Sequence, residues 1–171
     1  MLRGLLALYD VGMIVIKRGQ CVAQSQFGDA TWPIVRTAKG ESMDANTIFT
    51  IKPIGWVESS YEGGPAADVE ATIELFPAYA EGAADIKAGD RLMVLFYFDR
   101  ASEELLTVPL MGNGPLVGVF SSHAPMRPNS IGVTEVQVEA VDGLRMLVRG
   151  ADMFDGTPVL DLKPVPTRTE R

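Results

Sequence analysis

The stretch Arg91-Leu92-Met93-Val94-Leu95-Phe96-Tyr97-Phe98 is apolar at every position after its arginine and contains no Gly or Pro. Turn-forming residues bound it, with Gly89-Asp90 before it and Asp99 after it. A short, unbroken apolar run of this kind is typical of a strand that is covered on both faces. The sequence therefore predicts a fully buried central strand over residues 91–98.

Shorter β-type segments lie on both sides of this run. Val69–Leu75 alternates polar and apolar residues, as a strand with one solvent-facing side should. Asp142-Gly143 predicts a type I′ hairpin, because that turn needs positive φ at both central residues. Further strands are expected at 48–57, 115–121, 131–140, 144–149 and 158–163, with one helical turn at 78–84. The predicted fold class is all-β and mainly antiparallel, either a barrel or a sandwich.

Residues 1–45 are patterned differently from the rest of the chain. Their short apolar runs are interrupted by polar stretches, and Met43 stands just before the first well-patterned strand. Two interpretations stay open: an N-terminal extension that precedes a natural start at Met43, or a genuine strand or dimer arm at Leu5–Ile16. In both cases residues 46–171 are expected to form the main domain.

The charge balance is acidic, with 15 basic and 22 acidic side chains and a net charge of -7. Nucleic-acid-binding domains neutralise phosphates with Lys and Arg, so this balance disfavours an RNA partner. The lone Cys21 excludes an internal disulfide and suits a reducing cytoplasm, and one Cys with one His excludes a zinc pattern. The apolar segment Leu5–Ile16 is broken by Asp10 and is too short to span a membrane, so we expect a cytoplasmic protein.

A first cluster of chemically useful residues occupies 118–132, which reads G-V-F-S-S-H-A-P-M-R-P-N-S-I-G. His123, the only histidine, could titrate near neutral pH or bind a ligand, although a surface loop histidine is the simpler interpretation. Arg127 offers a planar fork for a carboxylate, a phosphate or an aromatic ring. The alternative for Arg127 is a structural salt bridge that locks the loop. Gly132 allows close approach of another chain segment.

A second cluster occupies 150–164 and combines Asp152, Asp155, Asp161 and Lys163. Asp161 and Lys163 are two apart on an expected strand and should share a face. Neighbouring carboxylates can serve as a proton acceptor and its orienting partner. Asp155-Gly156 is equally typical of a turn in which the aspartate caps the backbone.

The order and spacing of these clusters resemble the paired signatures of the TsaA-like (YaeB-like) family, which includes TrmO. The matching elements are R-P-N-S-I-G at 127–132 and D-G-T-P-V-L-D-L-K-P at 155–164, and the likeness covers about residues 48–165. The resemblance implies a small β-barrel, usually a homodimer, that binds S-adenosylmethionine near the subunit interface. It also implies methyl transfer to N6 of threonylcarbamoyladenosine in tRNA.

The resemblance assigns roles residue by residue. The expected cofactor-binding residues are Phe98, Asp99, His123, Val133, Gly150, Ala151 and Asp152. Arg127, Asn129, Asp161 and Lys163 would shape the substrate pocket or the dimer seam. Asp155 is the candidate catalytic residue, which would orient the acceptor or remove its proton. No metal is implied.

The chain also departs from the usual family pattern. Residues 61–67 contain no arginine where P-R-Q is common, His123 replaces a usual arginine, and Asp99 replaces a usual histidine. Each change removes positive charge or a polar ligand, which favours an acceptor smaller than tRNA. The alternative to a methyltransferase is a non-catalytic S-adenosylmethionine sensor or dimeric scaffold module.

Overall fold

The computed structural model describes residues 35–36, 42–43 and 50–166. Contacts divide the chain into two units, Met1–Lys52 and Pro53–Arg171. In the first unit, β1 (Val35–Arg36) pairs antiparallel with β2 (Ser42–Met43). The strand or arm expected at Leu5–Ile16 lies outside the described residues, so both interpretations of residues 1–45 stay predictions.

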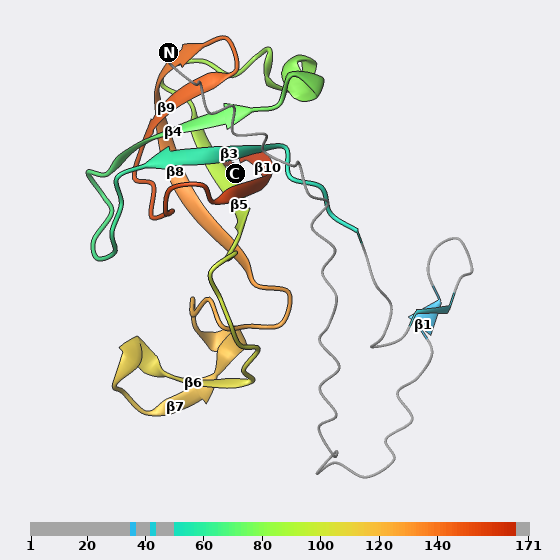
Figure 1. Cartoon of the computed structure of the whole chain (residues 1–171), viewed down its shortest axis with the longest axis vertical. Helices are drawn as coiled ribbons and strands as arrows, with labels where there is room; N and C mark the ends of the chain where they lie inside the picture. Colours follow the sequence, from blue (N-terminus) through green and yellow to red (C-terminus); the bar gives the residue numbers. More distant parts are fainter. Residues whose placement is uncertain (1–34, 37–41, 44–49, 167–171) are drawn as a thin grey trace, which may run out of the picture. The chain divides into compact units, whose positions relative to one another are not determined.

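In the second unit, six antiparallel strands form a closed ring in the order β10-β3-β4-β9-β8-β5 (Figure 1). Short 3-10 helices join some of them, and none of the helices in the described part of the chain is long and apolar enough to cross a membrane. The prediction of an all-β, mainly antiparallel fold is therefore confirmed. The strands are β3 (Gly55–Ser59), β4 (Glu70–Leu75), β5 (Arg91–Tyr97), β8 (Ile131–Asp142), β9 (Arg145–Arg149) and β10 (Pro158–Pro164), and the helices are η1 (Pro77–Ala83), η2 (Leu110–Gly112) and η3 (Val119–Ser121).

The core fills the inside of this ring with alternate residues from its strands. Branched aliphatic side chains dominate because they pack well on a pleated surface. Ala151 and Met153, which follow β9 in the chain, belong to the same cluster. The other buried members are Val57, Ala71, Ile73, Leu75, Leu92, Val94, Phe96, Val136, Val138, Met146, Val148 and Val159.

The prediction that residues 91–98 are buried on both faces is wrong. Along β5 only Leu92, Val94 and Phe96 are buried, and the residues between them are half-buried on the outer face. In a closed sheet one face of each strand points inward and the other points outward. The apolar run therefore gives β5 an apolar outer face that the ring itself does not cover.

Two local predictions also need correction. In the β8–β9 hairpin only Gly143 has positive φ, at 59°, so the turn follows the type II′ pattern rather than type I′. The first strand of the ring begins at Gly55, not at residue 48. Pro53 lacks the N–H that a strand needs, and Gly55 is packed so closely on β4 that a Cβ would lie 2.1 Å from the Glu74 carbonyl oxygen.

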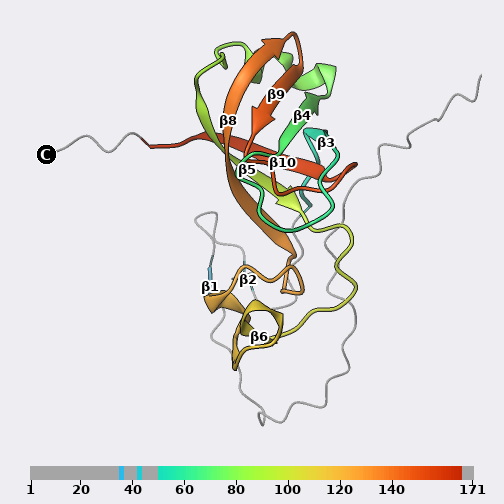
Figure 2. The same cartoon turned by 90° about the vertical axis from the view of Figure 1, so that its left-hand side faces the viewer.

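A small hairpin lies in the connection between β5 and β8. Its strands, β6 (Thr107–Pro109) and β7 (Leu116–Gly118), pair antiparallel and lie beyond the ring at the end where β8 begins (Figures 1 and 2). Val108 of β6 and Val119, directly after β7, are buried. The strand expected at 115–121 is thus divided into β7 and η3.

Candidate functional site

Apart from His123, the residues expected to bind the cofactor lie on or directly after three neighbouring strands of the ring, β5, β8 and β9. β5 ends beside the start of β8, where Leu95 lies opposite Val133 and the Phe98 N–H donates to the Ser130 carbonyl at 2.8 Å. Gly150 follows β9 and passes so close to β8 that a Cβ on it would lie 3.3 Å from the Glu135 carbonyl oxygen. The sheet order therefore brings the segments 98–99, 131–133 and 150–152 to one region.

The loop between η3 and β8 is organised by Arg127. Its guanidinium donates to the carbonyls of Ala124 (2.8 Å) and Val119 (3.1 Å) and also to that of Ser122. The alternative of a structural salt bridge is therefore not supported among the described residues, where the fork binds backbone oxygens and no carboxylate. This arrangement fixes the course of residues 119–127, and His123 stands exposed on that loop.

The turn after Arg127 uses unusual backbone conformations. Asn129 and Ser130 have φ values of 70° and 40°, and the buried Ser130 hydroxyl donates to the Arg127 carbonyl at 3.0 Å. Asn129 itself is exposed. Asparagine suits this turn, because it tolerates the left-handed region better than most residues.

The signature glycine at the start of β8 lies directly over a core ring. Gly132 is opposite Phe96, and a Cβ on Gly132 would lie 2.4 Å from the Phe96 Cζ atom. Phe96 in turn packs edge-on against Phe98, with ring centroids 5.0 Å apart. The close approach expected at Gly132 is confirmed, and it links the signature loop to the end of β5.

Asp155 lies in the turn before β10 and is exposed. One carboxylate oxygen, Oδ1, accepts a hydrogen bond from the Ser59 N–H at 3.1 Å. The turn interpretation is therefore confirmed, although the capped amide belongs to β3 rather than to the turn itself. Oδ2 accepts no hydrogen bond from the described residues.

Arg100 is a site residue that the sequence patterns did not single out. Its guanidinium donates to the Asp155 carbonyl at 2.8 Å and lies 4.8 Å from the centre of the Phe154 ring. Tyr61 also packs against Phe154, with ring centroids 5.4 Å apart. Only its position directly after Asp99 could have pointed to Arg100. Both signature loops are thus bonded to the end of β5, one through Phe98 and the other through Arg100.

Asp161 and Lys163 share a face of β10, as predicted, and form an ion pair of 2.7 Å. They lie opposite Leu95 and Met93 of β5. Leu95 is only two residues before the end of β5, but no hydrogen bond among the described residues joins Asp161 or Lys163 to Asp155. Ala151 is fully buried, whereas Asp99 and Asp152 are exposed.

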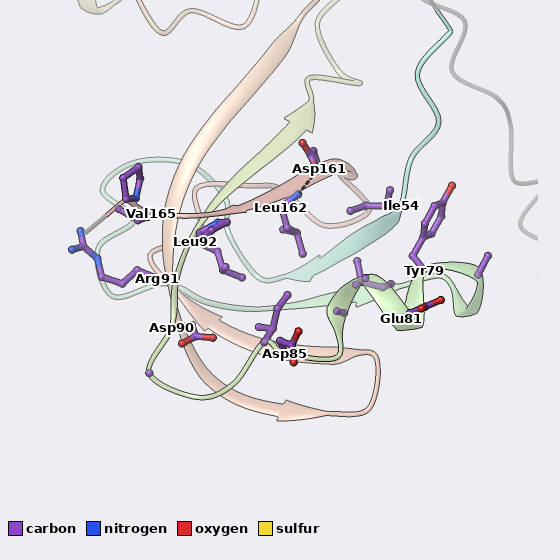
Figure 3. A pocket seen from close by; sticks show the side chains of 18 residues that line it. Ile54, Tyr79, Glu81, Asp85, Asp90, Arg91, Leu92, Asp161, Leu162 and Val165 are labelled. Carbon is purple, nitrogen blue, oxygen red and sulfur yellow. Dashed lines mark hydrogen bonds between the residues drawn. The ribbon is translucent and has the colours of Figure 1, made fainter. Parts of the chain in front are cut away.

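A separate groove of about 1500 Å³ lies beside η1 (Figure 3). Ile54, Leu92 and Leu162 give it apolar walls, and Glu81 and Asp85 stand near its rim. Of the expected site residues only Asp161 lines it. The groove is therefore distinct from the region where the signature loops meet.

The outer surface of the ring carries paired charges. Arg145 binds Glu58 at 2.6 Å and also Glu74, and Arg149 binds Glu70 and Glu139. The hydrogen bond from Arg145 lowers the pKa of Glu58 below its ordinary value. The bonds from Glu58 and from Glu139 raise the pKa of Arg145 and of Arg149 respectively. These arginines are neutralised by carboxylates and do not form a basic patch.

Comparisons with known proteins agree with this geometry. A probable S-adenosyl-L-methionine-binding protein of Pyrococcus abyssi is 35% identical over 125 residues, which cover 68% of this chain and 68% of the relative. A tRNA (adenine(37)-N6)-methyltransferase of Mus musculus is 30% identical over 138 residues, covering 72% of this chain and 32% of the enzyme. The crystal structure of TrmO from P. aeruginosa superimposes with a TM-score of 0.56 at 28% identity, covering 70% of this chain and 55% of that chain.

The chain therefore spans little more than half of the solved TrmO chain and about a third of the mouse enzyme. The region that the family model matches includes both signature loops and the ring strands from β4 to β10. Residues 59–170 match the model of the tRNA-methyltransferase O N-terminal domain, and the chain belongs to this TrmO (TsaA-like) family.

Proposed function

We propose that this chain binds S-adenosylmethionine where β5 ends and β8 begins, and that it catalyses methyl transfer to an acceptor nitrogen. The observation that supports this site is the pair of bonds from the end of β5, Phe98 to Ser130 and Arg100 to Asp155. These bonds hold both family signatures beside the same strand end. The relatives supply the chemistry, since one is described as binding this cofactor and another as a tRNA methyltransferase.

The side chains of this region suit the cofactor. Asp99 and Asp152 are exposed carboxylates that can accept hydrogen bonds from ribose hydroxyls and from the ammonium group. Phe98 and Val133 offer apolar surface for the adenine ring. A set of hydrogen-bond acceptors dominated by carboxylates fits a ligand that carries positive charge on its sulfonium and ammonium groups, and it would repel a polyphosphate.

When bound, the cofactor supplies an electrophilic methyl group, and the acceptor nitrogen must lose a proton. The chain contributes position and a proton acceptor. Asp155 is the candidate, because the Ser59 N–H holds Oδ1 while Oδ2 has no hydrogen bond from the described residues. The bond from Arg100 to the Asp155 carbonyl fixes the backbone of the same residue.

We place a small acceptor ahead of tRNA. Binding of tRNA depends on Lys and Arg side chains that contact phosphates. Arg91, Arg145 and Arg149 each pair with glutamate instead. Residues 61–67 also contain no arginine. The proposed acceptor atom is N6 of threonylcarbamoyladenosine, either in the free nucleoside or within tRNA.

A homodimer with the cofactor near its interface is part of this proposal, and so is a cytoplasmic location, which the lone Cys21 suits. Val133 supports the dimer, because it exposes an apolar side chain within the expected cofactor region. Asp161 and Lys163, on the neighbouring β10, are the other candidates for the seam.

Isothermal titration with S-adenosylmethionine and S-adenosylhomocysteine tests binding. We expect micromolar affinity that falls at least about tenfold, or 1.4 kcal/mol, in His123→Ala. Lys87→Ala is the matched control, since Lys87 is exposed in the turn before β5 and should not contact the cofactor. Absence of binding by the wild-type protein would refute the cofactor site.

Turnover with modified nucleosides and a tRNA pool tests catalysis. Asp155→Asn keeps an oxygen that can accept the Ser59 N–H bond but removes the proton acceptor. We expect unchanged unfolding temperature and a rate at least about 100-fold lower. Cofactor binding without product from any acceptor would instead favour the non-catalytic sensor.

A further inference from the structure

We propose that Arg100 determines the specificity of the acceptor site: its guanidinium binds a carboxylate of the acceptor, while the rings of Tyr61 and Phe154 contact the purine base. This inference rests on the proposed function, because it names the chemistry that the acceptor must carry at the same site. The three side chains come from the segments that follow β3, β5 and β9.

Arg100 differs from the arginines of the ring strands in its partners. Arg91, Arg145 and Arg149 each pair with a glutamate. Arg100 forms no ion pair with a described residue, and its Nη2 atom donates to the Asp155 carbonyl at 2.8 Å. A guanidinium holds several N–H donors in one plane, so the remaining donors can bind a carboxylate while this bond holds the group.

The ring of Phe154 helps to orient the guanidinium. The Arg100 Cζ atom lies 4.8 Å from the ring centre, which is within the range of a cation–π contact. Arg100 is exposed, and a long exposed side chain without such contacts would sample many rotamers. The ring and the carbonyl therefore preorganise this cation, so that a ligand loses less free energy in ordering it.

Tyr61 is held at both ends beside Phe154. Its backbone N–H donates to Ser59 Oγ at 3.0 Å, and its hydroxyl donates to the Gly64 carbonyl at 2.7 Å. The centroids of the two rings are 5.4 Å apart, and Phe154 is 37% exposed. Partly exposed aromatic rings of this kind offer faces on which a base can stack.

The same group of residues includes the proposed proton acceptor. Ser59 donates its own N–H to Asp155 Oδ1 at 3.1 Å, and Arg100 bonds to the carbonyl of that aspartate. The cation, the aromatic faces and the candidate base are thus linked by hydrogen bonds and ring contacts. An acceptor that fits them has a purine ring, a nitrogen that loses a proton and a carboxylate a few bonds away. Threonylcarbamoyladenosine has all three, because its threonyl part carries a carboxylate beside N6.

Two other anions could compete for Arg100, namely the carboxylate of the cofactor and a phosphate of a nucleotide. The bond from Arg100 to Asp155 favours the acceptor's carboxylate, because Asp155 must lie beside the nitrogen that it deprotonates. The experiment below distinguishes all three anions.

Isothermal titration in the presence of S-adenosylhomocysteine tests the inference without turnover. Threonylcarbamoyladenosine should bind at least about tenfold more tightly than its uncharged carboxamide. Arg100→Gln keeps an amide N–H for the Asp155 carbonyl but removes the charge, so this preference should be lost. Its affinity for S-adenosylmethionine should stay within about twofold of the wild type. Arg91→Gln removes a guanidinium at the other end of β5 and is the matched control, which should keep the preference.

Tyr61→Leu tests the contact with the base. It should weaken binding of the acid and of the carboxamide alike, because stacking does not depend on the carboxylate. Unchanged affinity for both nucleosides would overturn the base contact.

Several results would overturn the role of Arg100. One is a wild type that binds neither nucleoside, or binds both equally. Another is a loss of cofactor affinity in Arg100→Gln as large as the loss of nucleoside affinity, which would assign Arg100 to the cofactor. Adenosine 5′-monophosphate that binds with the same dependence on Arg100 would assign it to a phosphate. A protein that prefers the acid but forms no methylated product would refute only the proposed catalysis.

Discussion

Replacing Gly132 with alanine should destabilise the domain through a single steric conflict. The new Cβ would lie 2.4 to 2.9 Å from three carbons of the Phe96 ring, distances at which one of the two groups must move. The ring has little freedom, because Phe96 is buried in the core and packs edge-on against Phe98. Gly132 is equally restrained, since β8 pairs with β5 on both sides of it.

Overpacking of this kind typically costs 1 to 3 kcal/mol, and the rigid surroundings put Gly132→Ala at about 2 to 3 kcal/mol. For a domain of this size the unfolding temperature should fall by roughly 8 to 15 °C. Urea unfolding followed by circular dichroism measures the free energy directly.

Two controls make the cause specific. Gly118→Ala adds a methyl group where nothing lies within 4 Å and φ is -60°, so its effect should stay within about 0.5 kcal/mol. In a Phe96→Ala background, Gly132→Ala should cost less than about 0.5 kcal/mol, because the ring is gone. The reasoning is refuted if Gly132→Ala costs the same in both backgrounds.

Three further outcomes are expected. Arg127→Lys removes the guanidinium that binds three carbonyls, so the free energy of unfolding should fall by about 1 to 3 kcal/mol. The backbone amides of the 119–130 loop should also exchange hydrogen for deuterium faster, as measured by mass spectrometry. An unchanged exchange rate would contradict this role of Arg127. The bond from Arg145 lowers the pKa of Glu58 in the folded state below 4.5, so the ion pair stabilises the fold above pH 4.5 and this stabilisation is lost as the pH falls through the folded-state pKa. When the urea midpoint is plotted against pH, Glu58→Gln should therefore lose less stability than the wild type at acidic pH. Parallel curves for the two proteins would argue against the ion pair. Gly55→Ala would bring a Cβ within 2.1 Å of the Glu74 carbonyl oxygen and should cost about 3 kcal/mol or more in urea unfolding; a near-wild-type midpoint would show that β3 can shift.

Local patterning in the sequence was enough for most of the strands. Alternation identified β4, and the segments 131–140, 144–149 and 158–163 correspond to β8, β9 and β10. Pairing of strands far apart in the chain was not readable, because it depends on closure of the ring and not on neighbours in sequence. The same closure explains the error at β5: an apolar run cannot show by itself whether its second face meets protein or solvent.

The candidate site divides in the same way. The motifs at 127–132 and 155–164 were sufficient to recognise the family and to pick out Arg127, Asp155 and Gly132. They did not show that Arg127 binds carbonyls, that Asp155 caps Ser59, or that Arg100 bonds to the second loop. Each of these contacts depends on the path of a loop, which short-range patterns describe poorly.

The sequence by itself determined the all-β class, the family and the two signature segments, because strand alternation, turn residues and motif spacing are local properties of the chain. Only the tertiary structure decided which residues meet at the end of β5, and that Met111, Leu116 and Val133 face outward in uncharged patches. The hydrophobicity of a side chain gives the free energy that it gains when it leaves water, but only the fold determines whether another part of the same chain lies over that side chain.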